Sequence, residues 1–242
     1  MTKPEQLFLN VSLSDEATFS NFFSAPTSEN GLAVSSLQHF LNDKNEQFIF
    51  LWGASGSGVT HLLQAVCHLA QEKKLSFQYL PLRELVGYAP DDLCRGLEEL
   101  DLICIDGIEA VVGRADWESE LFHLFNRIKA LNHKLIAASN APVRGLPIQL
   151  ADLSSRLGWG LTLHLHTMTD EEKQTALQMR AKGRGLELTD EVAQFLIQRL
   201  ARDTNELFWQ LQRLDNASLQ EQRKLTIPFV KKVLGLGQRD IH

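Results

Sequence analysis

The sequence predicts an α/β domain, built as a parallel sheet with helices on both faces, followed by a small helical domain. Short apolar runs alternate with helical segments from about residue 46 to about residue 167, and helical segments without clear strands follow. Apolar strands that alternate with helices are typical of a parallel sheet, because both faces of such a sheet are covered. With 242 residues, 44% of them hydrophobic, the chain can form one such domain and an appendage.

Five apolar runs of four to six residues are the candidate strands. The first run is followed by a Gly/Ser loop and then by a helix whose apolar residues share one face. The segment 116–131 is the clearest amphipathic helix between the later runs. The five runs are FIFLW (48–52), FQYL (77–80), LICID (102–106), KLIAAS (134–139) and LTLHL (161–165).

The helical domain is predicted from its helix ends. Thr169 and Glu172 form a capping box at the start of a first helix, which ends near Gly183. Thr189 caps a second helix, and a third carries leucines at helical spacing. A last short helix is expected to begin at Pro228, because proline suits the first turn of a helix.

We expect three parts in the chain. Residues 1–15 lack regular periodicity and are expected to form a flexible tail. Residues 16–167 are expected to form the α/β domain, and residues 168–242 the helical domain. The sequence has no internal repeat and no low-complexity tract, so no further division is expected.

Composition limits the classes of function. The formal net charge is −6 and the pI is about 5.8, which weighs against broad, salt-driven binding to DNA. The three cysteines form no CxxC pair and the eight histidines show no metal-ligand spacing, so neither a zinc site nor a disulfide framework is expected. No apolar run is long enough to span a bilayer, and MTKPEQLFLN contains no signal-peptide block. We expect a cytoplasmic protein without membrane contact.

The segment GASGSGVT, from Gly53 to Thr60, lies between a predicted strand and a predicted helix, which is the context of a phosphate-binding P-loop. Its glycines let backbone N–H groups surround phosphate oxygens, and the helix N-terminus adds positive potential. Thr60 is at the position whose hydroxyl holds Mg²⁺, but Val59 replaces the lysine that reaches the β- and γ-phosphates. The alternative is a Gly/Ser turn that only joins strand and helix.

Two strand ends add polar residues to this region. Asp106 ends an apolar strand, where a Walker-B carboxylate would hold the metal, and Gly107 follows where many ATPases have the acid that orients water. Asn140, at the end of the fourth predicted strand, fits a polar sensor of the γ-phosphate. Glu109 is close in sequence but is expected to point elsewhere. Both strand ends are also compatible with ordinary turn residues.

Four segments of the chain resemble the AAA+ domain of the bacterial replication initiator DnaA. The stretch TFSNFF (18–23) resembles that family's segment near the adenine, and the resemblance extends from about residue 18 to about residue 234. The sequence is most similar to initiator-homologous regulators, because the initiator's DNA-binding helix-turn-helix domain has no counterpart after KLTIPFVKKVLGL. The family implies an AAA+ fold with a helical lid. The four segments are FLWGASGSGVTHLLQA (50–65), LICIDGIEA (102–110), KLIAASNAP (134–142) and SSRLGWGLTLHL (154–165).

The resemblance implies a nucleotide site in which Thr60 and Asp106 would hold Mg²⁺. Three positions depart from the expected pattern in one direction: Val59, Gly107 and Asn205 replace a lysine, an acid and a lid arginine. We therefore expect a bound nucleoside diphosphate, ADP by resemblance, and weak ATP hydrolysis. The residues expected at the nucleotide are Phe22, Gly53, Ala54, Ser55, Gly56, Ser57, Gly58, Val59, Thr60, His61, Asp106, Asn140 and Asn205.

Arg156, within SRLGWG, is an arginine finger by this resemblance. We expect it on a turn before the fifth strand, at the domain surface, where it could enter the ATP site of a neighbouring subunit. A finger supplied in trans raises the rate of hydrolysis by roughly 10³–10⁵. The alternative is an arginine at a helix end that forms a salt bridge.

Gln6, Leu7, Phe8 and Leu9 resemble the short motif by which proteins dock on the DNA polymerase sliding clamp. The glutamine amide would fix the orientation of the peptide, and the apolar side chains would fill a groove. The alternative is a strand or a hydrophobic staple packed on the chain's own domain.

The resemblance implies a negative regulator of replication initiation that docks on the clamp and stimulates hydrolysis of DnaA-bound ATP. A self-sufficient ATPase of helicase-loader type is the first alternative, and Val59 argues against it. A sequence-specific DNA binder is the second, opposed by the acidic charge and the absence of a helix-turn-helix segment. A homo-oligomer packed head to tail through the finger edge stays open.

Overall fold

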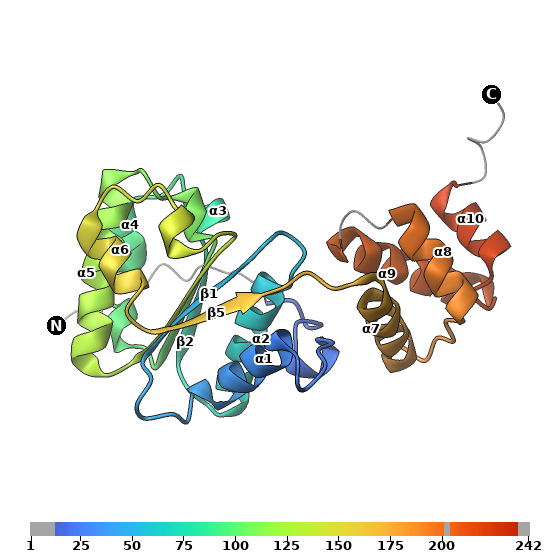
Figure 1. Cartoon of the computed structure of the whole chain (residues 1–242), viewed down its shortest axis with the longest axis horizontal. Coiled ribbons are helices and arrows are strands. Elements are labelled where there is room, and N and C mark those ends of the chain that lie inside the picture. Colours follow the sequence, from blue (N-terminus) through green and yellow to red (C-terminus); the bar gives the residue numbers. More distant parts are fainter. Residues whose placement is uncertain (1–12, 201–203, 237–242) are drawn as a thin grey trace. The chain divides into compact units, whose positions relative to one another are not determined.

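The structure of the chain is a computed structural model that describes residues 13–200 and 204–236. The motif at residues 6–9 lies outside the described residues. Of the described residues, 13–54 and 58–166 form one compact unit, and 55–57, 167–200 and 204–236 form a second. Figure 1 shows a sheet with helices in the first unit and helices alone from α7 onward.

A five-stranded parallel sheet in the order β2-β3-β4-β1-β5 forms the centre of the first unit (Figure 1). The predicted fold class is therefore confirmed, and each of the five apolar runs forms a strand. The carboxyl ends of parallel strands meet at one edge of a sheet, so the loops after β1, β3 and β4 come together there. The strands are β1 Phe48–Gly53, β2 Phe77–Pro81, β3 Leu102–Asp106, β4 Lys134–Ser139 and β5 Leu161–Leu165.

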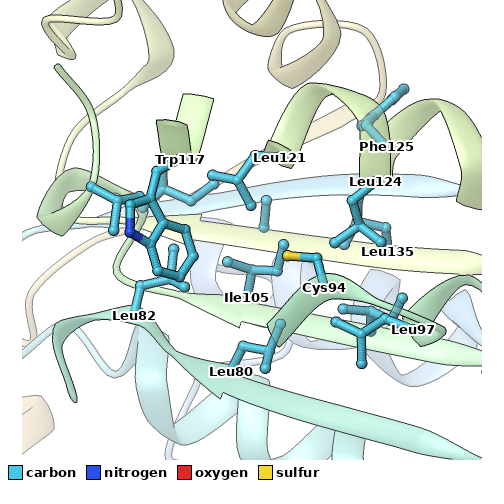
Figure 2. Close-up of a cluster of buried hydrophobic side chains, with 14 of the residues drawn as sticks. Leu80, Leu82, Cys94, Leu97, Ile105, Trp117, Leu121, Leu124, Phe125 and Leu135 are labelled. Carbon is cyan, nitrogen blue, oxygen red and sulfur yellow. The ribbon is translucent and has the colours of Figure 1, made fainter. Parts of the chain in front are cut away.

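Side chains of the sheet enter two cores, one on each face. The helices of this unit are α1 Glu29–Phe40, α2 Val59–Glu72, α3 Leu82–Leu85, α4 Pro90–Cys94, α5 Ala115–Leu131 and α6 Ala151–Leu157, with 3-10 turns η1 Phe19–Asn21, η2 Leu97–Glu99, η3 Ile108–Ala110 and η4 Val143–Gly145. In β1, Phe48 and Phe50 enter one core and Ile49 and Leu51 the other, because successive strand residues point to opposite faces. Residues of α5 cover the first core, as Figure 2 shows, and residues of α1 and α2 cover the second.

Helix α1 is an element that the sequence analysis did not predict. Ser28 caps its N-terminus by accepting a hydrogen bond from the Gly31 N–H at 3.1 Å. Asn30 then joins the helix to the chain after β5 through two hydrogen bonds, each 2.9 Å long, with the backbone of His166. The buried side of α1 includes Asn30, Gly31 and Ala33, which are polar or small, so its apolar periodicity is weak.

The described chain begins against α2. The backbone N–H of Ser14 donates to Oε1 of Gln64 at 2.9 Å, and the Ser14 carbonyl oxygen lies 3.0 Å from Nε2 of His68. The end of the expected flexible tail is therefore attached to the domain. Within the described residues, no helix is long and apolar enough to cross a membrane, and no group of three or more His, Cys, Asp or Glu side chains could hold a metal ion.

Four helices make up most of the second unit: α7 Asp170–Gly183, α8 Asp190–Leu200, α9 Thr204–Glu221 and α10 Ile227–Leu234. The predicted capping box is confirmed, because Thr169 accepts from the Glu172 N–H and the Glu172 carboxylate accepts from the Thr169 N–H. Leucines of α7, α8 and α9 form the core of this unit. An ion pair of 3.2 Å between Arg184 and Asp215 joins the end of α7 to α9.

Candidate functional site

The P-loop, Gly53–Thr60, joins β1 to α2. Gly53 ends the strand, residues 54–58 form the loop, and Val59, Thr60 and His61 open the helix. Gly58 occupies the N-cap position of α2. Its φ of +97° is a backbone conformation that glycine adopts without strain. The hydroxyl of Ser57 is buried and has no hydrogen-bond partner among residues 13–200 and 204–236, so a polar group of the loop is left for a ligand.

Phe22 packs directly on this loop. A Cβ atom at Gly58 would lie 2.5 Å from Cε2 of the Phe22 ring, which is closer than real Cβ contacts. The Phe22 ring centroid is 5.6 Å from that of His61, and Nε2 of His61 lies 2.8 Å from the Thr18 carbonyl oxygen. The structure thus brings together the segment around residues 18–22 and the start of α2, two regions that the sequence analysis assigned to the nucleotide.

The side chain of Val59 takes part in packing. It is partly buried and lies against the apolar core that α1 and α2 cover. A lysine at this position would reach the β- and γ-phosphates of a bound nucleotide. The phosphate loop therefore has its backbone donors and its helix N-terminus, but no cationic side chain at the position that usually supplies one.

Asp106 connects β3 to the P-loop. Its Oδ2 accepts a hydrogen bond of 2.7 Å from the Thr60 hydroxyl and another of 2.7 Å from the Tyr79 hydroxyl. Burial first, and then the negative charge of Asp106, raise the pKa of Tyr79, so the phenol stays protonated and donates. The sequence analysis did not find Tyr79. It belongs to β2, and only the pairing of β2 with β3 places it beside Asp106.

The pair formed by Thr60 and Asp106 fits Mg²⁺. A hydroxyl and a carboxylate oxygen are the hard oxygen ligands that this ion takes, and phosphate oxygens and waters usually complete its coordination.

Gly107 occupies the position after β3 at which many ATPases have the acid that orients the attacking water. Gly107 has a φ of +77°, and a Cβ atom there would lie 3.4 Å from Cγ of Arg83. The Arg83 guanidinium forms a 2.6 Å ion pair with Oε1 of Glu109, and Oε2 of Glu109 accepts from the Asn140 N–H at 3.2 Å. The expectation that Glu109 points elsewhere is wrong. Glu109 lies between Arg83 and the Asn140 backbone, and its carboxylate pairs with the Arg83 guanidinium.

Asn140 and Asn205 occupy different parts of the fold. Asn140 follows the end of β4 and is exposed, beside the end of β3. Asn205 lies in the first turn of α9 in the second unit, and it is also exposed. Within the first unit, the structure therefore places Asn140 near Asp106, as strand ends in a parallel sheet require.

Arg156 lies in the last turn of α6, which spans Ala151–Leu157. The expected position on a turn is therefore wrong, because the helix ends only after Leu157. The side chain is half-buried, and its guanidinium carbon lies 5.9 Å from the centroid of the Phe125 ring. Arg156 forms no ion pair within residues 13–200 and 204–236, so the structure offers no support for the salt-bridge alternative.

Comparison with known families covers both units. Residues 13–164 match the family model of the bacterial DnaA ATPase domain. The chain belongs to the DnaA family of AAA+ proteins. Residues 170–234 match the family model of the Hda lid domain, so the helical unit also places this chain among Hda/DnaA-family proteins.

Solved structures agree on the fold. Domain III of the Thermotoga maritima replication initiation protein DnaA is 22% identical, with a TM-score of 0.78, and the match covers 94% of this chain and 99% of that one. AMPPCP-bound DnaA from Aquifex aeolicus is 24% identical, with a TM-score of 0.71 and coverage of 83% and 65%. The Thermotoga maritima RuvB Holliday junction branch migration motor is 17% identical, with a TM-score of 0.65 and coverage of 90% and 73%.

Gly58→Ala is expected to lower the free energy of unfolding by about 2 kcal/mol, because alanine is disfavoured at positive φ and its methyl group overlaps the Phe22 ring. Gly96→Ala is the matched control, since Gly96 has a φ of +77° and nothing within 4 Å of its Cβ position. Urea unfolding of both variants measures the difference. Equal losses would contradict close packing of Phe22 on the P-loop.

Proposed function

We propose that this DnaA-family protein is a negative regulator of replication initiation, which presents Arg156 to ATP bound on DnaA and stimulates its hydrolysis. The observation that carries the proposal is the last turn of α6, where the half-buried Arg156 has an aromatic neighbour and no acidic partner in the described chain. The chain's own P-loop has Val59 where a cation is usual. The cation is thus available to another molecule's nucleotide.

The chemistry in this proposal belongs to a composite site. The planar guanidinium of Arg156 would donate to oxygens of the transferring γ-phosphoryl group, where negative charge spreads in the transition state. DnaA would supply the nucleotide, the metal and the attacking water. Because this chain contributes one charged group and no bond changes on it, it is a stimulating partner of the ATPase.

We propose that the chain's own site holds a nucleoside diphosphate, ADP by family resemblance. The P-loop backbone, the Ser57 hydroxyl and the packed Phe22 ring support binding of such a ligand. Thr60 and Asp106 would hold Mg²⁺, which would offset phosphate charge when bound. The absence of a lysine at residue 59, of an acid at residue 107 and of an arginine at residue 205 weakens γ-phosphate recognition. The AMPPCP-bound DnaA from Aquifex aeolicus, which shares this fold, supports a nucleotide as the ligand.

We also propose that Gln6–Leu9 docks on the sliding clamp. Such docking would concentrate Arg156 near DnaA on the same DNA, since tethering raises the effective concentration of a weakly binding partner. The acidic net charge of −6 makes recruitment through a partner a better route than direct binding to DNA.

Arg156→Ala is expected to reduce the stimulated hydrolysis of DnaA-bound ATP to the rate of DnaA alone, because a finger in trans contributes roughly 10³–10⁵ in rate. The measurement is a single-turnover assay with clamp-loaded DNA and ATP-bound DnaA. Arg95→Ala is the control, since Arg95 is an exposed arginine of the same unit that pairs with Asp92. The proposal fails if Arg156→Ala returns DnaA to its diphosphate form as fast as the unaltered chain.

The unaltered chain is expected to bind ADP at least as tightly as ATP and to turn ATP over slowly. Val59→Lys should strengthen ATP binding about tenfold relative to ADP, because the ammonium group reaches the γ-phosphate. Equilibrium titration with both nucleotides checks this, with turnover by the purified chain measured in parallel. A strong ATP preference with brisk turnover in the unaltered chain would support a helicase-loader type of ATPase instead.

Deletion of residues 1–10 is expected to abolish binding to the isolated sliding clamp and to leave the thermal midpoint of unfolding nearly unchanged. Clamp binding is measured by surface-immobilised titration, and the midpoint by circular dichroism. Substitution of Lys3 by alanine serves as the control, because Lys3 is in the same peptide outside the motif. A large loss of stability on deletion would show that the peptide packs on its own domain.

A further inference from the structure

Two aromatic rings and two cations, one of which is Arg156, form a continuous row. The guanidinium carbon of Arg156 lies 5.9 Å from the centroid of the Phe125 ring, and the Phe125 and Trp159 rings meet edge to face at 6.1 Å. The ammonium group of Lys129 lies 3.8 Å from the Trp159 ring centroid. Both cation–ring distances are within the range of about 6 Å at which a ring quadrupole attracts a cation.

Phe125 cannot turn away from Arg156, because neighbours hold its ring from two sides. Phe125 is 4% exposed, and its ring meets the ring of Phe48, the first residue of β1, edge to face at 4.9 Å. Trp159 contacts the same ring from the segment that follows α6. Figure 2 shows Phe125 on α5, at the end of the row of side chains that covers the sheet. The Phe125 ring is therefore held in the core, and it lies next to the half-buried Arg156.

The chain after Arg156 returns to the sheet at a fixed point. A Cβ atom at Gly160 would lie 2.1 Å from the carbonyl oxygen of Phe48, so only glycine allows this close approach. The N–H groups of Gly158 and Trp159 donate to the carbonyl oxygens of Ser154 and Arg156 at 3.1 Å, which closes the helix end. These contacts set Trp159 against Phe125 and fix the backbone that carries Arg156.

We propose that Phe125 is a positioning residue for Arg156, and that Trp159, with Lys129 over its ring, keeps the Phe125 ring in place. A free arginine side chain has many rotamers, and in the bound complex most of them do not place the guanidinium at the transferring γ-phosphoryl group. The ring restricts these rotamers before a partner arrives, so the guanidinium is presented already oriented. The inference rests on the proposed function, because it concerns the same arginine finger.

The test uses Phe125→Leu, which removes the ring and keeps an apolar side chain of similar reach. In single-turnover hydrolysis of DnaA-bound ATP at increasing concentrations of the full chain, the maximal stimulated rate should fall about tenfold. The half-saturating concentration should change by less than twofold, and Phe125→Tyr should restore the maximal rate. Phe40→Leu is the matched control, because Phe40 is also buried under a cation, with Lys134 at 4.8 Å, on the other core of the unit.

A purely structural role would lower the stability of Phe125→Leu and Phe40→Leu alike and leave the maximal rate of both unchanged, which would overturn the inference. A raised half-saturating concentration with an unchanged maximal rate would also overturn it, in favour of docking. If Arg156→Ala loses stimulation and Phe125→Leu does not, the positioning inference fails and the proposed function stands. If Arg156→Ala retains stimulation, the proposed function fails, and the positioning inference fails with it.

A second variant covers the case in which Phe125→Leu does not fold. Trp159 is 50% exposed, so Trp159→Leu is expected to retain the fold and to lower the maximal rate about threefold. Trp209→Leu is its control, since Trp209 is 54% exposed and has Arg213 at 5.0 Å over its ring in the other unit. An unchanged maximal rate in Trp159→Leu would contradict the positioning role.

Discussion

Helix α5 holds the segment that carries Arg156 at both of its ends. At the start of α6, the buried carboxylate of Glu118 accepts hydrogen bonds from the N–H groups of Gln149 and Leu150, the shortest of them 2.7 Å long. Beyond the end of α6, Phe125 packs against Trp159. Since α6 has only seven residues, it has little stability of its own, and these contacts decide where it begins and ends. The direction in which the guanidinium points depends on them.

An AAA+ site needs a loop that binds phosphate and charged side chains that act on the γ-phosphate, and this chain retains only part of that set. The backbone of the P-loop is retained, with Gly58 at positive φ and the Thr60 hydroxyl hydrogen-bonded to Asp106. Two positions that usually carry groups acting on a γ-phosphate differ here: Val59 packs against the core, and Gly107 stands where an acid is usual. This composition is the basis of our proposal that the site holds a nucleoside diphosphate and turns ATP over slowly. In the proposed function, the guanidinium of Arg156 acts instead on a partner's nucleotide, where its field acts on developing charge.

The sequence was informative wherever local pattern decides the structure. The five strands follow from apolar runs, the Thr169 capping box from its spacing, and Asp106 from its place at a strand end. Pairing between distant segments decides the rest. Tyr79 reaches Asp106 because it pairs with Cys104, two residues earlier on the same face of β3, and no local pattern gives that register. The direction of Glu109 and the contact between Phe125 and Arg156 likewise depend on tertiary packing.

The central claim is that Arg156 stabilises the transition state of hydrolysis on another molecule. A group that does so must bind a transition-state analogue more tightly than a ground state. The most direct measurement is therefore the affinity of this protein, on clamp-loaded DNA, for DnaA carrying ADP–aluminium fluoride and for DnaA carrying AMPPCP. The account predicts that the unaltered chain prefers the aluminium fluoride form by about tenfold or more, and that Arg156→Ala binds both forms equally. An equal preference in the alanine variant and the unaltered chain would contradict it.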